Sequence, residues 1–435
     1  MPPGPSPGVG AGIGAGAGRL AWATMNRLAT PPAVTPFPTP WGGFDLTRFP
    51  EDPRERLRAW DAADEYLLRH LAGEADSAEG RATALAGRAV TVLGDRWGAL
   101  TTALAAAPAT APEGSRPAGI TQVSDSHLAQ RATLANLARA GADPAAVRLL
   151  TTRDTPPERI DVLLVRVPKS LALLEDQLHR LAPALHPDTV VVGTGMVTEI
   201  HTSTLKLFER ILGPTRTSLA VRKARLIFCT PDRALDPGPN PWPHRYALPD
   251  DVGAVSGRTV VNHAGTFCAD RLDIGTRFLL AHLPTAAPGA RVVDLGCGNG
   301  VLGTAAALAA PGAELLFVDE SHQAVASAAE TFRANLGPDA RAEFRTADAL
   351  ADADVPPGSV DLVLNNPPFH SHQATTDATA WRMFTGARRA LRPGGELWVV
   401  GNRHLDYHVK LRRLFGNCRT VAGNPKFVVL KAVKR

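Results

Sequence analysis

Two halves of this chain carry the same landmarks in the same order, and this repetition constrains the fold more than any other feature. Leu-Gly-x-x-x-Gly at 93–98 recurs at 295–300, and Asp-Val-Leu-Leu at 161–164 recurs as Asp-Leu-Val-Leu at 361–364. Two further pairs follow, a Pro-containing turn before a Val-Val-Gly run and a Lys-Leu pair before a glycine. We interpret the series as an internal duplication. Chance similarity is the alternative, because βα units resemble one another.

Each half alternates short apolar runs with amphipathic stretches, which is the pattern of a parallel α/β sheet covered by helices on both faces. We therefore predict two tandem Rossmann-like α/β domains. The predicted strands are 89–93, 162–167 and 189–192 in the first half and 291–295, 314–318, 360–364 and 396–400 in the second, and the predicted helices include 57–71 and 171–181.

Composition marks where the two domains begin and end. Residues 1–40 are mostly Gly, Ala, Pro, Ser and Thr, which cannot bury an apolar core, so we predict a disordered tail. This tail lacks the basic start and continuous apolar run of a secretory signal, and Met25 is an alternative first residue. The proline-rich segment 231–244 predicts a linker. The predicted domains therefore span 41–236 and 237–435.

The composition excludes several classes of protein. Hydrophobic residues make up 44% of the chain, and its 4 cysteines include no Cys-x-x-Cys pair, which excludes a wholly disordered chain and a disulfide-stapled domain. No uncharged apolar run reaches the roughly 18 residues of a membrane helix, so we expect no membrane partner. His370 and His404 have no second ligand at metal spacing, so we expect no metal. The features together indicate a protein of the reducing cytoplasm.

Positive charge is concentrated at the end of the chain. Residues 402–435 hold nine Lys or Arg against the single Asp406, although the whole chain has a formal charge of only +5. Such a basic segment suits a partner with a phosphate backbone, because neutralising phosphates releases counterions. The alternative is a solvated basic face that serves solubility.

A glycine-rich turn at 294–300 lies directly between a predicted strand and a predicted helix. Its glycines allow a tight turn and a close backbone approach to a ligand, and the helix start supplies unpaired N–H donors. This arrangement favours the binding of a nucleotide-like cofactor. The predicted cofactor-binding residues of the turn are Asp294, Gly296, Cys297, Gly298, Asn299 and Gly300.

Two carboxylates follow the next strands of the second half. Asp319 ends the strand after the glycine-rich turn, where doubly wound sheets bind a ribose, although it could instead cap the following helix. Asp348 follows the third predicted strand, where a carboxylate can accept from an adenine amine. We predict that both belong to the cofactor site.

The most specific motif is Asn-Pro-Pro-Phe at 366–369, which follows the strand at 360–364. The two prolines end the strand and fix the chain, so the Asn366 amide and the Pro367 carbonyl become two rigid acceptors. Together with the ring of Phe369 they suit a planar conjugated amine, whose nitrogen can then attack an electrophilic methyl group. We predict that Asn366, Pro367, Pro368 and Phe369 are catalytic and that Asn366 also borders the cofactor. A plain proline-rich turn is the alternative.

With these motifs, the second half resembles class I S-adenosylmethionine-dependent methyltransferases, and Asn-Pro-Pro-Phe resembles the motif of their amino-methylating branch. From Trp41 onward the chain resembles the RsmC and RlmG group of ribosomal RNA guanine-N2 methyltransferases, and its large-subunit members most closely. The segments that carry this resemblance are 59–68, 167–175, 201–205, 366–370, 402–407 and 426–434.

The resemblance implies S-adenosylmethionine as the cofactor and the N2 amine of a guanine in large-subunit (23S) ribosomal RNA as the substrate. It implies that 294–300 holds the cofactor, Asp319 its ribose and Asp348 its adenine, while 366–369 holds the guanine. It places 272–276 over the methionine end, whereas 267–271 departs from the expected Phe-Ser-Arg pattern. The expected RNA contacts in this half are Arg403, His404 and Lys426.

The duplication predicts that the first half is catalytically silent. A turn without its central glycine cannot approach a cofactor, and an arginine offers donors where acceptors are needed. Because three of the four replacements are basic, we expect RNA contacts at Arg166 and Lys169; the alternative is that the basic residues fill a decayed pocket. The replacements are Val92 for Asp294, Arg96 for Gly298, Arg166 for Asn366 and Lys169 for Phe369.

Other functions stay open on the sequence alone. The substrate could be small-subunit (16S) ribosomal RNA, and the same four residues could serve a glutamine amide or an adenine amine. A ribosome assembly factor that binds the cofactor without catalysis belongs to a different class. The sequence does not identify the nucleotide or the oligomeric state.

Overall fold

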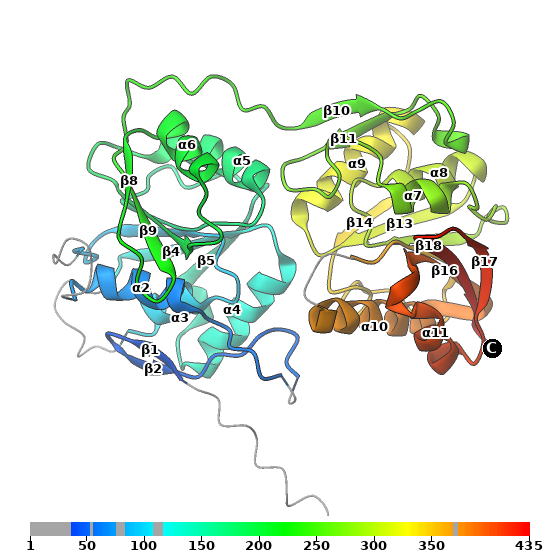
Figure 1. The fold of residues 1–435 in the computed structure, drawn as a ribbon, viewed down its shortest axis with the longest axis horizontal. Coiled ribbons are helices and arrows are strands. Elements are labelled where there is room, and N and C mark those ends of the chain that lie inside the picture. The colour runs from blue at the N-terminus through cyan, green and yellow to red at the C-terminus, as the bar shows by residue number, and fades with distance from the viewer. Residues whose placement is uncertain (1–35, 53–54, 75–82, 108–115, 369–372) are drawn as a thin grey trace, which may run out of the picture.

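The computed structural model describes residues 36–52, 55–74, 83–107, 116–368 and 373–435. They form two α/β domains side by side, joined by an extended segment that crosses between them (Figure 1). The strands of the first sheet are β3 (Ala89–Leu93), β4 (Gly119–Ser124), β5 (Val147–Thr151), β6 (Val162–Arg166), β7 (Val190–Met196), β8 (Thr215–Thr217) and β9 (Ala224–Cys229). Those of the second are β12 (Arg291–Leu295), β13 (Glu314–Asp319), β14 (Glu343–Thr346), β15 (Val360–Asn365), β16 (Leu391–Asn402), β17 (Arg419–Gly423) and β18 (Phe427–Val433).

The two sheets have the same topology. Their strand orders are β5-β4-β3-β6-β7-β9-β8 and β14-β13-β12-β15-β16-β18-β17. In each, five parallel strands are followed by an antiparallel pair, and every strand of the first sheet has a counterpart at the same place in the second. The prediction of two tandem Rossmann-like domains is confirmed, and the shared topology supports the duplication.

Helices cover both faces of each sheet, with one apolar cluster on each face. In the first domain α2 (Ala62–Leu71) and α3 (Ala99–Ala105) pack on one face and α5 (Leu171–Leu181) and α6 (Thr202–Ile211) on the other, and α4 (His127–Arg139) follows β4. In the second, α8 (Val301–Ala309) and α9 (His322–Leu336) pack opposite α10 (Gln373–Ala390) and α11 (Tyr407–Phe415), while α7 (Ile274–Leu280) precedes the sheet. Among the described residues no helix has both the length and the apolar character that a bilayer crossing needs.

Two predicted boundaries are wrong for identifiable reasons. The helix expected over 57–71 begins only at Ala62, because Asp61 accepts a hydrogen bond from the Ala63 N–H and forms a capping box with Asp64. The expected tail extends to residue 40, but β1 (Phe37–Thr39) pairs with β2 (Gly42–Phe44), and the Phe37 ring is buried against Trp60. The remainder of the expected tail, 1–35, lies outside the described residues.

Equivalent bonds tie the same strands together in both halves. The Asp161 carboxylate accepts from the Ala89 N–H at 2.8 Å, and the Asp361 carboxylate accepts from the Arg291 N–H at 2.8 Å. In each case an aspartate at the start of one strand, directly before β6 or at the second residue of β15, holds the first residue of the neighbouring strand. The repeated Asp of this sequence landmark therefore makes the same bond in both domains.

The starts of α4 and α9 meet between the domains. Ser126 and Ser321 form a short antiparallel bridge, with the His127 N–H donating to the Glu320 carbonyl and the His322 N–H donating to the Asp125 carbonyl, both at 2.9 Å. Each half thus presents an acidic residue, a serine and a histidine to the other. This Ser-His repeat is a landmark of the duplication that the sequence analysis missed.

The second domain packs an aromatic cluster where α8 meets the sheet. The Phe317 ring of β13 stacks on Phe344 with centroids 4.9 Å apart and meets Phe332 edge-on at 5.5 Å. Gly303 of α8 lies directly over this ring, because a Cβ built there would lie 2.3 Å from the Phe317 ring. The absence of a side chain at 303 therefore sets how closely α8 approaches β13.

We expect Gly303→Ala to lower the free energy of unfolding by about 1 to 3 kcal/mol, because the packed ring cannot yield to an added methyl group. Gly119 is the matched control, since a Cβ there meets no atom within 4 Å. Urea unfolding followed by circular dichroism measures both variants. Equal stabilities for Gly303→Ala and Gly119→Ala would show that the approach of α8 to Phe317 is not tight.

Candidate active site

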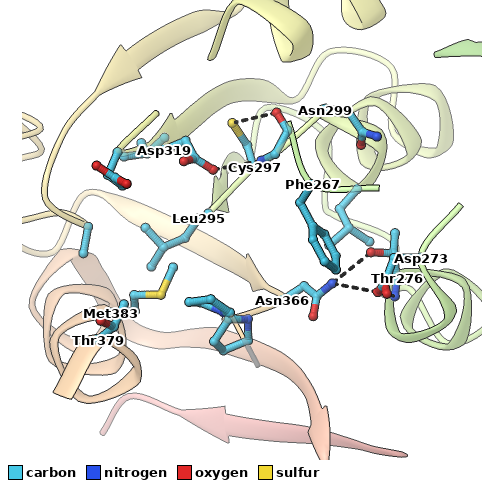
Figure 2. Close-up of a pocket in the computed structure, with 18 of the residues that line it drawn as sticks. Phe267, Asp273, Thr276, Leu295, Cys297, Asn299, Asp319, Asn366, Thr379 and Met383 are labelled. Carbon is cyan, nitrogen blue, oxygen red and sulfur yellow. Dashed lines mark hydrogen bonds between the residues drawn. The ribbon is translucent and has the colours of Figure 1, made fainter. Parts of the chain in front are cut away.

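A cavity of about 470 Å³ opens at the carboxyl ends of β12, β13 and β15 (Figure 2). Leu295 of β12 pairs with Val318 of β13 on one side and with Asn365 of β15 on the other, so the residues that follow these strands converge at one edge. The strand order reverses between β12 and β15, which is where doubly wound sheets bind ligands. No cluster of three His, Cys, Asp or Glu that could hold a metal occurs in the described part of the chain.

The glycine-rich turn forms the floor of the cavity. The N–H groups of Gly296 and Cys297 donate to the Val318 carbonyl at 2.8 and 3.0 Å, which fastens the turn to β13. Gly296 and Gly298 have φ of 71° and 52°, in the left-handed region that favours glycine. A Cβ at Gly296 would lie 2.8 Å from the Met383 methyl, whereas Gly298 faces open space. The predicted residues Gly296, Cys297, Gly298 and Asn299 all line the cavity.

Two predicted cofactor residues of this turn lie behind it and do not line the cavity. The Asp294 carboxylate is buried and accepts from the Gly303 N–H at 2.8 Å, so it fixes the start of α8, and burial raises its pKa to about 8. Gly300 caps the same helix with φ 76°, and a Cβ there would lie 2.7 Å from the Ala328 Cα. Both residues therefore support the turn and α8, and their predicted contact with a cofactor stays a prediction.

Asp319 and Asp348 line the cavity at the ends of their strands, as expected. Asp319 accepts from the Gly298 N–H at 2.9 Å, and the cap of α9 is Ser321, which excludes the alternative that Asp319 is that cap. Asp348 accepts from the Arg382 side chain at 3.2 Å. Burial raises the pKa of both carboxyls, because it disfavours their charged forms.

The Asn366 amide is held in one orientation. Its Nδ2 donates to Asp273 Oδ2 at 3.1 Å and to Thr276 Oγ1 at 2.9 Å (Figure 2). The reverse orientation would turn the amide oxygen toward the Asp273 carboxylate, which has no hydrogen to donate when ionised. Asn366 Oδ1 is buried and has no hydrogen-bond partner among the described residues. It is therefore an acceptor available to a ligand.

The structure describes part of the remaining residues predicted to be catalytic. Pro367 and Pro368 line the cavity, and the Asn365 side chain donates to the Leu295 carbonyl at 2.6 Å, which joins the motif to the glycine-rich turn. Phe369 and His370 lie outside the described residues. The sequence analysis did not predict the contact of Asp273 and Thr276 with Asn366, although an aspartate before a helix is a recognisable capping signal.

The first domain carries the counterpart of this constellation in altered form. Arg166, at the position of Asn366, donates to Asp61 at 2.6 Å, to Asp64 at 3.2 Å and to Glu199 at 2.9 Å. Asp61 caps α2 as Asp273 caps α7, and Asp64 lies three residues into α2 as Thr276 does in α7. The second domain therefore holds the Asn366 amide with a carboxylate and a hydroxyl, whereas the first domain holds the Arg166 guanidinium with carboxylates.

Arg166 is fully buried by this ion cluster, with 0% of its side chain exposed. The expectation that it contacts RNA is therefore wrong for this structure, and the alternative, that it fills the decayed pocket, fits the geometry. Arg96 joins the same cluster through Glu199 at 2.6 Å. Lys169 is exposed, so its role in RNA binding stays a prediction.

The three RNA contacts expected in the second half lie together. Arg403 and His404 follow β16 in a short 3-10 helix (Arg403–Leu405), and the Arg403 N–H donates to the Lys426 carbonyl at 3.0 Å. All three side chains are exposed. Since β16 runs parallel to β15, they lie toward the same edge of the sheet as Asn366.

In comparisons with known proteins, the two halves of the chain match two different family models. Residues 34–233 match the family described as RLMG N-terminal domain, and residues 257–431 match the methyltransferase small domain. The ribosomal RNA large subunit methyltransferase G of Streptomyces avermitilis is 72% identical over 400 residues, which cover 92% of this chain and 99% of the relative. The protein of that name from Pseudomonas aeruginosa strain UCBPP-PA14 is 49% identical over 399 residues, with the same coverage.

The chain belongs to the ribosomal RNA large subunit methyltransferase G family. Among solved structures, the 16S rRNA N2 methyltransferase RsmC of T. thermophilus, in complex with AdoMet and guanosine, has a TM-score of 0.68. The match covers 92% of this chain and 98% of that one at 22% identity, so it shows a shared two-domain fold.

For this family member we expect Arg166→Met to lower the free energy of unfolding by about 3 to 5 kcal/mol, because three carboxylates lose their shared cation. Lys169→Met is the matched control, since its side chain is exposed in the same segment. Urea unfolding of both variants at pH 7 provides the measurement. A stable Arg166→Met variant with weakened RNA binding would restore the RNA-contact interpretation.

The ion cluster also predicts a pH dependence. Burial alone would raise the pKa of Glu199, but Arg166 and Arg96 outweigh burial and lower it to about 2. A carboxylate whose pKa is lowered in the folded state stabilises the fold at pH values above its unfolded-state pKa. This contribution is lost as the pH falls through the folded-state pKa. Glu199→Gln should therefore be destabilising near pH 7, and the difference should shrink between pH 4.5 and about 2. A difference that stays constant over a pH series of urea unfolding would contradict the pairing.

Proposed function

We propose that this protein transfers a methyl group from S-adenosylmethionine to the exocyclic N2 amine of a guanine in large-subunit (23S) ribosomal RNA. The single observation that carries the proposal is the buried, unpartnered Oδ1 of Asn366 beside the glycine-rich turn. Family membership supports the reaction and the RNA, because the curated relatives are large-subunit ribosomal RNA methyltransferases by name. Acting on ribosomal RNA would place the protein in the cytoplasm.

The cavity suits S-adenosylmethionine, which when bound supplies an electrophilic methyl group on a sulfonium centre. Gly296 to Asn299 leave the floor open to a close backbone approach, and Gly298 faces free space. We assign the ribose to Asp319 and the adenine amine to Asp348. The Val318, Ala347 and Met383 side chains border the same space and offer apolar contact for a base.

The protein residues hold the target amine without a strong base. Asn366 Oδ1 accepts one amine hydrogen, and we assign the second to the Pro367 carbonyl, which the proline rings hold rigidly. Accepting both hydrogens draws the nitrogen lone pair out of conjugation and fixes its direction. Asp273 and Thr276 occupy both Nδ2 hydrogens, so the amide cannot turn its donors toward the amine.

We assign contacts with the RNA backbone to the basic segment at 402–435. Arg403, His404 and Lys426 are exposed near the edge that carries Asn366. The same segment continues in α11, where Arg412 and Arg413 lie in the last turn. We expect phosphate contacts here, with Lys169 as a further contact from the first domain, to position the RNA without specifying its sequence.

Asn366→Ala should lower methyl transfer at least about 100-fold, because a preorganised acceptor is lost, while cofactor affinity stays within about threefold. Thr276→Val keeps the acceptor but frees one Nδ2 hydrogen, so its loss of activity should be smaller. Labelled methyl transfer to ribosomal RNA and calorimetric titration with S-adenosylhomocysteine measure the two effects separately. Unchanged methylation by Asn366→Ala would overturn the role of Asn366 and favour a cofactor-binding assembly factor.

A further inference from the structure

The first domain reaches into the cofactor cavity. Leu128, in the first turn of α4, lines the same space as Asp319, Glu320 and Asp348. Of the described residues that line this cavity, Leu128 is the single one from the first half of the chain. Its side chain is half-buried, so a part of it remains available for contact.

Hydrogen bonds join the start of α4 to the segment that bears Asp319. Ser126 Oγ donates to Glu320 Oε2 at 2.6 Å, and the His127 N–H donates to the Glu320 carbonyl at 2.9 Å. The backbone N–H of Leu128 also donates to the Glu320 carboxylate. Because Glu320 directly follows Asp319, these bonds fix Leu128 beside the carboxylate assigned to the ribose.

A second connection reaches the loop that bears Asp348. His127 Nε2 lies 2.7 Å from Asp352 Oδ2, and Asp352 Oδ1 accepts from the Asp348 N–H at 2.8 Å. The histidine side chain is one-fifth exposed, so the pair is partly shielded from water. The first turn of α4 therefore braces both segments that carry carboxylates at one end of the cavity. Asp319 lies across the cavity from Asn366 (Figure 2).

We infer that the catalytically silent domain is a structural part of the cofactor site, with Leu128 covering the adenosine end. Ser126 and His127 are positioning residues that act through Glu320 and Asp352. The inference rests on the proposed cofactor and extends it to a residue that no comparison assigns. Because the cavity wall spans the domain interface, cofactor binding and domain docking must stabilise each other.

The test is calorimetric titration of the full chain with S-adenosylhomocysteine. Leu128→Ala should raise the Kd about fivefold, because apolar contact with the adenosine is lost. Leu134→Ala is the matched control, since Leu134 lies on the exposed side of the same helix, and its Kd should stay within about 1.5-fold of the unaltered chain. Equal Kd values for the two variants would overturn the inference.

Hydrogen exchange of the unaltered chain gives a second measurement that does not depend on a variant folding. Adding S-adenosylhomocysteine should slow exchange at residues 127–129 as well as in the turn at 296–299. Protection of the turn without protection of α4 would overturn the inference while leaving the proposed function intact. Failure of the unaltered chain to bind S-adenosylhomocysteine would instead overturn both.

Discussion

The proposed chemistry of this site depends on the orientation of the Asn366 amide. Asp273 and Thr276 accept from both of its N–H groups, so its oxygen is left buried and without a described hydrogen-bond partner, at a residue that lines the cavity. Three features position this amide: Asp273 and Thr276 lie at the start of α7, two prolines follow Asn366 after β15 ends, and Asn365 bonds the end of β15 to the start of the glycine-rich turn. A rigid neutral acceptor can direct an amine without a charged base.

The first domain has the same arrangement of strands without the acceptor that Asn366 provides in the second. Both domains keep the strand order of the sheet, an aspartate cap on the helix that packs near this site, and the bond from Asp161 or Asp361 to the first residue of the neighbouring strand. At the position that corresponds to Asn366, Arg166 supplies donors in place of an acceptor, and Asp64 supplies a carboxylate in place of a hydroxyl, so a buried ion cluster fills this position. The first domain nevertheless keeps its interface, where α4 meets the acidic edge of the active half.

The sequence predicted the sheet of each half and the place of Asn366 directly after a strand, because both depend on local patterns, apolar runs and prolines after a strand. It could not tell which residues of the glycine-rich turn line the cavity, so it did not show that Asp294 and Gly300 support α8 instead of lining the cavity. It also could not show that Arg166 is neutralised by carboxylates about a hundred residues away in the chain. Leu128 lines the cavity because the two domains dock against each other, and no local sequence pattern predicts that docking.

The most direct test is incubation of the purified protein with methyl-labelled S-adenosylmethionine and deproteinised large- and small-subunit ribosomal RNA from cells that lack the gene. Nucleoside analysis then identifies the labelled base. Label in N2-methylguanosine of the large-subunit RNA is the predicted result. Label confined to the small-subunit RNA or to another base, or no label despite intact cofactor binding, would contradict the proposed reaction.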